Sequence, residues 1–205
     1  MTRQLTALAL LVAAAACTSG PPPPVDARPY EEQILDWRTR RDLFFKNGED
    51  SPLLPEDRVT FTGLPYYPID PNLRVPAALT EERSNPPVII ELQTSSSEPD
   101  RMRKVGTLGF TIDRQTHTLT AFAPADMRVI TRLFVPFRDV TSETETYKGG
   151  RYLDLDRTPT GLYDLDFNRA YHPNCVYNVS WVCPIPPREN RLSIPIRAGE
   201  RLPPQ

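Results

Sequence analysis

The sequence lacks the features by which several large classes of protein are usually recognised. It has only 9 glycines and 2 histidines, and it contains no phosphate-binding glycine loop, no dinucleotide fingerprint and no G-x-S-x-G motif. Basic residues are not in excess, because 24 Lys and Arg stand against 26 Asp and Glu. These absences argue against nucleotide chemistry at a standard loop, against a serine triad and against nucleic acid as a partner.

Proline, at 24 positions, is the abundant residue instead. This content disfavours a long helical bundle and favours many short strands joined by fixed corners. We therefore predict a mainly β protein, an antiparallel sandwich or barrel-like single domain over residues 30–205. The strands are expected at Val59–Thr62, Val88–Leu92, Val105–Ile112, His117–Phe122, Arg128–Phe137, Arg151–Leu155, Leu162–Asp166 and Leu192–Ile196.

One helix is expected ahead of the strands, over residues 30–47. Its large apolar side chains recur at three- and four-residue steps, at Tyr30, Ile34, Trp37, Phe44 and Phe45. Acidic residues begin it, basic residues crowd its later turns, and Asn47-Gly48 ends it, as the helix dipole favours. The pattern predicts an amphipathic helix packed against the sheet; a helix lying on a membrane is the alternative.

The start of the chain has the features of an export signal. Arg3 precedes an apolar run from Leu5 to Ala16, which predicts a secretory signal peptide over residues 1–16 that is too short to span a bilayer stably. Ala14-Ala15-Ala16-Cys17 resembles a bacterial lipobox, in which the cysteine is diacylated and becomes the new N-terminus. An ordinary signal peptide cut near Cys17, or a buried helix, is the alternative.

A lipid on Cys17 would anchor the protein to a membrane, and the proline-rich residues 17–29 would act as a stiff spacer. Thr18 is not the aspartate that resembles an inner-membrane retention signal. The expected location is therefore the extracytoplasmic side of the bacterial cell envelope, including the outer membrane where the host has one.

Cys175 and Cys183 are the two cysteines that remain once Cys17 is lipidated. In an oxidising compartment a disulfide is the simplest interpretation. Two alternatives stay open, namely reduced buried thiols and a metal site formed by these two residues with His172.

Polar residues gather towards the C-terminal half of the chain. As a candidate binding cluster we take Glu145, Tyr147, Arg151, Asp166, Asn168, Tyr171, Asn190 and Glu200. Gly149-Gly150-Arg151 could bind an anion, or it could be a glycine bend with Arg151 paired to a structural acid such as Asp166. Further carboxylates could serve as an acid–base pair or, at Asp154 and Asp156, as calcium ligands, although solvated turns are the simpler interpretation.

Many short motifs along the chain resemble the bacterial and archaeal family catalogued as domain of unknown function 1684. They are Trp37-Arg38, residues 41–46, Ser51-Pro52-Leu53, residues 61–64, Tyr66-Tyr67-Pro68, residues 134–139, Glu145-Thr146-Tyr147, residues 150–153, Asp166-Phe167-Asn168, residues 183–187, Glu189-Asn190 and Ala198-Gly199-Glu200. The chain departs from the family at Glu143, where glycine is favoured, and at His172, where asparagine is usual. The resemblance implies no established activity.

Three functional hypotheses follow. The first is a tethered binding or envelope-associated module that recognises a small ligand or an envelope component. The second is a hydrolase-like enzyme that uses carboxylate, Arg and Tyr side chains, with or without a metal. The third makes the polar cluster a purely structural network. No cofactor is predicted.

Overall fold

The computed structural model describes residues 26–203. The signal peptide predicted for residues 1–16, the lipidation site Cys17 and most of the proline-rich spacer therefore lie outside the described residues. In the described part, the helices are α1 (Tyr30–Asn47) and α2 (Pro55–Thr60), with short 3-10 turns η1 (Pro71–Leu73), η2 (Phe167–Arg169), η3 (Asn174–Val176) and η4 (Arg188–Asn190). The strands are β1 (Arg74–Glu81), β2 (Ile89–Leu92), β3 (Asp100–Ile112), β4 (Gln115–Pro124), β5 (Arg132–Phe137), β6 (Arg151–Asp156) and β7 (Leu162–Asp166).

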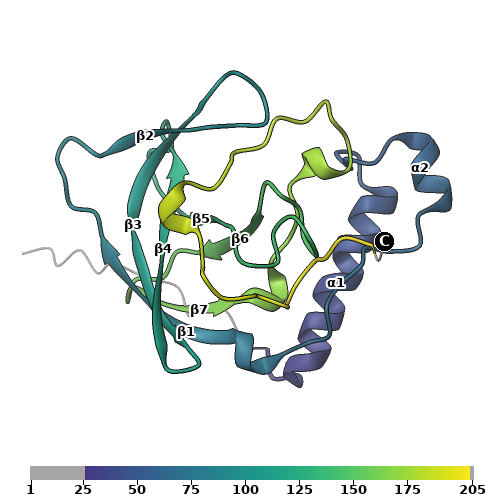
Figure 1. Cartoon of the computed structure of the whole chain (residues 1–205), viewed down its shortest axis with the longest axis horizontal. Coiled ribbons are helices and arrows are strands. Elements are labelled where there is room, and N and C mark those ends of the chain that lie inside the picture. Colours follow the sequence, from purple (N-terminus) through teal and green to yellow (C-terminus); the bar gives the residue numbers. More distant parts are fainter. Residues whose placement is uncertain (1–25, 204–205) are drawn as a thin grey trace, which may run out of the picture.

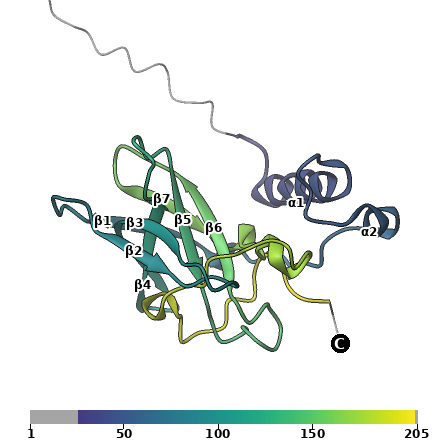
Figure 2. The same cartoon turned by 90° about the horizontal axis from the view of Figure 1, so that it is seen from above.

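The strands form one antiparallel sheet that curls until it is nearly closed into a barrel, as Figures 1 and 2 show. Its strand order is β6-β5-β4-β3-β1-β7, with β2 paired to β3 beside this path. The two helices lie together to one side of the sheet (Figure 2). The predicted fold class, a mainly β and barrel-like protein with a helix near its N-terminus, is confirmed.

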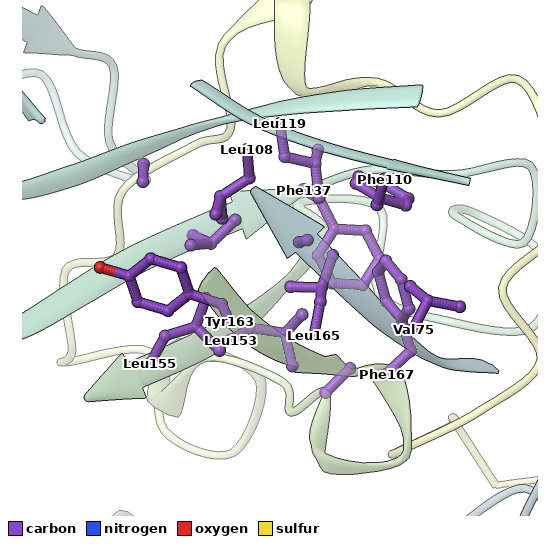
Figure 3. Packing of buried hydrophobic residues seen from close by; sticks show 14 of the residues in the cluster. Val75, Leu108, Phe110, Leu119, Phe137, Leu153, Leu155, Tyr163, Leu165 and Phe167 are labelled. Atoms are coloured by element: carbon purple, nitrogen blue, oxygen red, sulfur yellow. The ribbon is translucent and has the colours of Figure 1, made fainter. Parts of the chain in front are cut away.

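The hydrophobic core fills the inside of this curled sheet (Figure 3). Strand β5 shows how the sequence produces it, because side chains along a strand alternate between its two faces. Leu133, Val135 and Phe137 are fully buried, and Phe137 packs edge-on against Phe167 with ring centroids 5.4 Å apart. The residues between them, beginning with Phe134, point to the outer face, where the candidate site lies.

The strands expected at Val105–Ile112 and His117–Phe122 are confirmed as parts of β3 and β4, which form a hairpin. Ile112 pairs with Gln115 across a two-residue turn made by Asp113 and Arg114, whose φ angles are 49° and 63°. Positive φ at both central positions gives the turn the twist that a tight hairpin needs.

Strand β1 was not predicted, and Pro76 is the reason. Proline cannot donate to a β ladder, so it weakens the prediction of a strand around it. In the structure β1 pairs with β7 from Arg74 to Ala78, but it pairs with β3 only from Ala77 onward. Pro76 therefore lies where β1 has one neighbour and the missing N–H is not needed.

Helix α1 has the predicted bounds, and Ile34 and Phe45 are its fully buried residues. Phe44, expected on the same face, is 41% exposed. The strand predicted over Val59–Thr62 is wrong, because residues up to Thr60 belong to α2. Pro55 in the first turn, followed by two acidic residues, favours a helix start and outweighs a short alternating pattern.

The strand predicted at Leu192–Ile196 is also wrong. This segment runs along the barrel without a regular ladder, although Leu192 donates its N–H to the carbonyl of Arg138, at 2.8 Å, and Val140 donates to Ile194, at 3.3 Å. None of the helices within residues 26–203 is long and apolar enough to cross a membrane.

Candidate functional site

The residues predicted as a binding cluster do not surround one pocket. The structure distributes them over several polar networks, in which most of the side chains are buried and bonded to backbone groups. Fully buried are Arg151, Asp166, Asn168, Asn190 and Glu200, whereas Glu145, Tyr147 and Tyr171 are partly exposed.

The Glu200 carboxylate is buried and receives donors from three parts of the chain. Arg41 of α1 donates from Nε to Oε1, while the His172 N–H (2.7 Å) and the Tyr177 hydroxyl (3.0 Å) donate to Oε2. The Arg41 guanidinium also lies over the Tyr171 ring, 4.7 Å from its centroid. Because it accepts from Arg41 of α1 and from two groups outside the helix, this carboxylate connects α1 to the barrel.

His172 is a neutral, buried side chain. Burial, reinforced by the positive charges of Arg151 and Arg41, lowers the pKa of His172 to about 3. Its Nε2 accepts a hydrogen bond from the Tyr147 N–H at 3.2 Å, which places the ring proton on Nδ1. An imidazole held in this way is a poor general base near neutral pH.

Arg151 connects the start of β6 to the C-terminal segment. It donates to the carbonyls of Ile196 (2.6 Å), Ala198 and Glu200 (3.1 Å), and it pairs with the buried Asp139 at 3.5 Å. Its acidic partner is thus Asp139, not the Asp166 suggested by the sequence. Burial lowers the pKa of Arg151, and the charge of Asp139 opposes this effect. Arg151 is enclosed by these acceptors and is not presented to a ligand.

Asp166 and Asn168 hold the other end of α1. Asp166 accepts hydrogen bonds from the Tyr30 hydroxyl (2.8 Å) and from the Asn168 N–H (3.0 Å). The Asn168 side chain then bonds both backbone groups of Asp70, at 2.9 and 2.8 Å. These contacts order the turns around η1 and η2.

Asn190 and Glu145 also have structural partners. The Asn190 side chain accepts from the Thr120 N–H (2.7 Å) and donates to the carbonyls of Thr120 and Pro136 (2.8 and 2.7 Å). Nearer the surface, Arg197 donates to Glu145 at 2.7 Å. This hydrogen bond lowers the pKa of Glu145, so the carboxylate is ionised near neutral pH.

Other carboxylates gather in a hollow of about 340 Å³ between β6 and β7. Desolvation by neighbouring protein atoms raises the pKa of Asp154 there, although the residue is exposed on β6 and the Tyr171 hydroxyl donates to it at 2.9 Å. Asp164 is paired with Arg74 at 2.6 Å. Within residues 26–203 no group of three or more His, Cys, Asp and Glu side chains is placed to hold a metal ion.

One residue of the predicted cluster, Tyr147, lines an open pocket of about 440 Å³ on the outer face of the sheet. We call it the Tyr147 pocket. One wall is formed by the Tyr147–Gly149 loop and β6, and the other by the Pro184 segment and the residues after β2. It is lined by Thr94, Ser95, Arg138, Glu143, Tyr147, Lys148, Gly149, Tyr152, Cys175, Cys183, Pro184 and Ile185.

An apolar hollow of about 250 Å³ adjoins the Tyr147 pocket. The two share Tyr152, Cys183 and Pro184, and the Tyr152 hydroxyl donates to the Pro184 carbonyl. Phe134 and Trp181 line the second hollow, and the Phe134 ring lies edge-on to Tyr152 with the ring centroids 4.8 Å apart.

Cys175 and Cys183 are joined as a disulfide, with their Cα atoms 6.1 Å apart. The thiolates needed for the alternative metal site with His172 are therefore not present. Ser95 N–H donates to the Cys183 carbonyl at 2.9 Å, which connects the disulfide loop to the segment after β2. The disulfide thereby forms part of a pocket wall.

Sequence reasoning missed the pocket residue Arg138. Phe134, Pro136 and Arg138 alternate with the core residues of β5, so their outward direction could have been inferred from the period of two. The pairing of Pro136 with Tyr152, which completes this face, depends on the strand register. Thr94 and Ser95 come from a distant loop, and no local pattern marks them.

Comparison with known proteins gives relatives without a described function. Residues 59–201 match the model of a family described as "Protein of unknown function (DUF1684)". A solution NMR structure of an uncharacterized protein from Haloarcula marismortui is 39% identical, covers 84% of this chain and 94% of its own, and has a TM-score of 0.65. The comparison with curated proteins gives no match.

Proposed function

The chain belongs to the DUF1684 family, which has no described function, and we therefore propose a function from the chain's own features. We propose a lipid-anchored, extracytoplasmic binding module whose Tyr147 pocket holds a small ligand. The ligand is either a free small molecule or a part of an envelope component. The observation that carries the proposal is the pocket itself. Its volume of about 440 Å³ lies within the range of pockets for small molecules.

The composition of the pocket supports binding. The Tyr147 and Tyr152 rings, the disulfide and Ile185 supply apolar surface, while Arg138 supplies charge. Ligand pockets commonly combine a mainly apolar lining with a few polar groups that orient the ligand.

The anchor is supported by the sequence alone. The apolar run up to Ala16, the lipobox-like Ala14-Ala15-Ala16-Cys17 and the prolines that follow are the expected order of signal, lipidation site and spacer. Such a protein would stay at a membrane through its lipid, with residues 30–205 outside the cytoplasm.

The structural hypothesis accounts for most of the predicted polar cluster. Arg151, Asp139 and Asn190 bond backbone groups that would otherwise be unpaired, which is the role of a buried network. The proposed ligand site therefore moves from this cluster to the pocket beside it. The hydrolase-like alternative has one supporting observation, the raised pKa of Asp154, and would be supported by loss of a hydrolytic activity in Asp154→Asn.

Anchoring is tested by expressing the full chain and Cys17→Ser in a bacterial host that processes lipoproteins. We expect the wild-type protein in the membrane fraction, with diacylated Cys17 found at its N-terminus by mass spectrometry, and the variant unmodified and released. An unmodified N-terminus or an uncut signal in the wild-type protein would refute the anchor.

Binding is tested by NMR titration of the full-length protein with a panel of small organic acids, amines and neutral sugars. We expect at least one class to shift the amide signals of Gly149 and Lys148 and of the Ser95 segment, while signals of α2 stay unchanged. If millimolar concentrations of every compound leave the pocket signals unmoved, the binding proposal fails.

A further inference from the structure

Arg138 lines the Tyr147 pocket without a counter-charge. Among the described residues its guanidinium makes no hydrogen bond and no ion pair, and its Nε is buried without a partner. Arg138 is partly buried. Charges that are taken out of water are normally paired, because removing an ion from water costs free energy that a partner must offset. An arginine in this condition is poised for an anionic partner that is not part of the chain.

The backbone of Arg138 is fixed on both sides. Its N–H donates to the Asn190 carbonyl at 2.9 Å, and its carbonyl accepts from the Leu192 N–H at 2.8 Å. Asn190 is in turn bonded to Thr120 and Pro136, so these contacts set the direction in which the side chain leaves β5. The backbone of Arg138 is therefore held in place before any ligand binds, which lowers the entropy cost of binding.

Gly150 makes room for the stem of Arg138. A Cβ at this position would lie 2.5 Å from the Phe137 carbonyl oxygen, 2.8 Å from Cγ of Pro186 and 3.1 Å from Cγ of Arg138. The φ angle of Gly150 is 92°, which other residues rarely adopt. The aliphatic part of the Arg138 side chain thus packs beside Gly150, where any other residue would place a Cβ.

The groups around Arg138 favour an anion that also carries an apolar part. Lys148 adds a second positive charge to the same pocket, and Glu143 is the one carboxylate in its lining. Glu143 forms no ion pair with either of them among the described residues. Tyr147, Tyr152 and the disulfide add apolar surface to the same lining.

We propose that the Tyr147 pocket binds an organic acid, with its carboxylate on the Arg138 guanidinium and its apolar part against Tyr147 and Tyr152. The planar guanidinium matches a carboxylate with two parallel donors, which gives both strength and orientation. This inference rests on the proposed binding function and goes further by naming the chemical class of the ligand.

The test uses 3-phenylpropionate as the probe and its neutral amide, 3-phenylpropionamide, as the matched control. Both are titrated into the full-length protein, followed by the amide signals of Gly149 and Gly150 and by the Nε–H signal of Arg138. We expect the acid to bind at least about tenfold more tightly than the amide, because one charge-assisted pair of hydrogen bonds separates them.

Two variants test whether the guanidinium of Arg138 is the group that binds the carboxylate. Arg138→Met keeps the stem that packs over Gly150 but removes the guanidinium, and we expect it to weaken binding of the acid at least about tenfold. Arg132→Met is the control, because Arg132 lies at the other end of β5, is exposed and pairs with the exposed Asp156. It should bind the acid as the wild-type protein does.

Each other outcome has a defined meaning. Equal binding of acid and amide, or no loss in Arg138→Met, would overturn the organic-acid inference and leave the binding proposal standing. Acetate binding as tightly as 3-phenylpropionate would overturn the role of the apolar wall. Failure of 3-phenylpropionate, its amide and the whole panel of acids, amines and neutral sugars to shift the pocket signals would overturn both proposals.

Discussion

Single polar side chains in this protein stand in for backbone hydrogen bonds that the sheet does not provide. Asn190 bonds both backbone groups of Thr120 and the carbonyl of Pro136. Asp139 accepts from the N–H of Ile196 at 2.6 Å. Each side chain pairs with a buried backbone donor or acceptor that would cost about 1–3 kcal/mol if it were left without a hydrogen bond.

The sequence identified these residues as important without indicating what they do. Arg151, Asp166 and Asn190 belong to a polar cluster in the sequence, but the choice between binding a ligand and binding backbone depends on burial. For Arg151, burial depends on how the Ile196–Glu200 segment lies against the barrel, and that segment forms no regular helix or strand. The pocket residue Arg138 was missed because its neighbours come from three separate parts of the chain.

His172 gives a prediction about pH at this scale. The pKa of His172 is lowered to about 3 in the folded protein by burial and by Arg151 and Arg41, against about 6.5 in an unfolded chain. Between these values the unfolded state binds a proton that the folded state does not. Stability should therefore fall as pH drops from about 6.5 towards 3, by several kcal/mol at most.

The measurement is urea unfolding of the wild-type protein and of His172→Asn at several pH values between 4 and 7. Asparagine can still accept from the Tyr147 N–H but does not titrate in this range. We expect the wild-type protein to lose more stability than the variant over this interval. Parallel pH curves would show that His172 does not remain neutral in the fold.

At the scale of elements, predictability follows the strength of the local pattern. Helix α1 has strong signals at both ends, and β3 and β4 each contain an alternating run; the helix and both strands were predicted. Strand β1 contains Pro76, whose position at a place with one neighbouring strand is known only from the register. Four alternating residues at Val59–Thr62 were too few to outweigh the helix-start signals before them.

The disulfide loop is an element whose stability can be tested separately. Cys175 and Cys183 close a loop of about nine residues, for which the chain-entropy model gives about 2.5 kcal/mol. We expect the double variant Cys175→Ser/Cys183→Ser to be less stable by about this amount in urea unfolding. Its fold should persist, because the main core lies within the barrel.

Thiol titration of the unfolded wild-type protein under non-reducing conditions provides the control. Cys175 and Cys183 should give no free thiol before reduction and two after it. Two free thiols without reductant, or equal stability of the double variant, would contradict the role assigned to the disulfide.

At the scale of the whole molecule, α1 is joined to the barrel by polar contacts as well as by buried apolar side chains. Its buried side chains are Ile34 and Phe45. Along its length, Tyr30 bonds Asp166, Arg38 donates to the Tyr67 carbonyl at 2.9 Å, and Arg41 pairs with Glu200. An amphipathic pattern predicted that the helix would pack on the sheet, but it could not predict these partners, which lie in distant parts of the sequence.

The Arg41–Glu200 pair is the contact on which the docking of α1 should depend most. Glu200 is fully buried and the Arg41 side chain is 17% exposed, so removing one partner leaves a charge with little access to water. For Glu200→Gln and Arg41→Met we expect losses of about 3–5 kcal/mol each, as for other broken buried ion pairs. The double variant should lose clearly less than the sum, because neither charge is then left alone.

Hydrogen exchange locates the effect. In Glu200→Gln the amides of α1 should exchange faster by a larger factor than those of β3 and β4, because the helix loses its fastening while the barrel keeps its core. Glu145→Gln is the matched control: its partner Arg197 is at the surface, so the coupling should be much smaller and α1 unaffected. Additive losses in the double variant, or equal acceleration in helix and barrel, would mean that the ion pair stabilises the fold as a whole and does not hold α1 in particular.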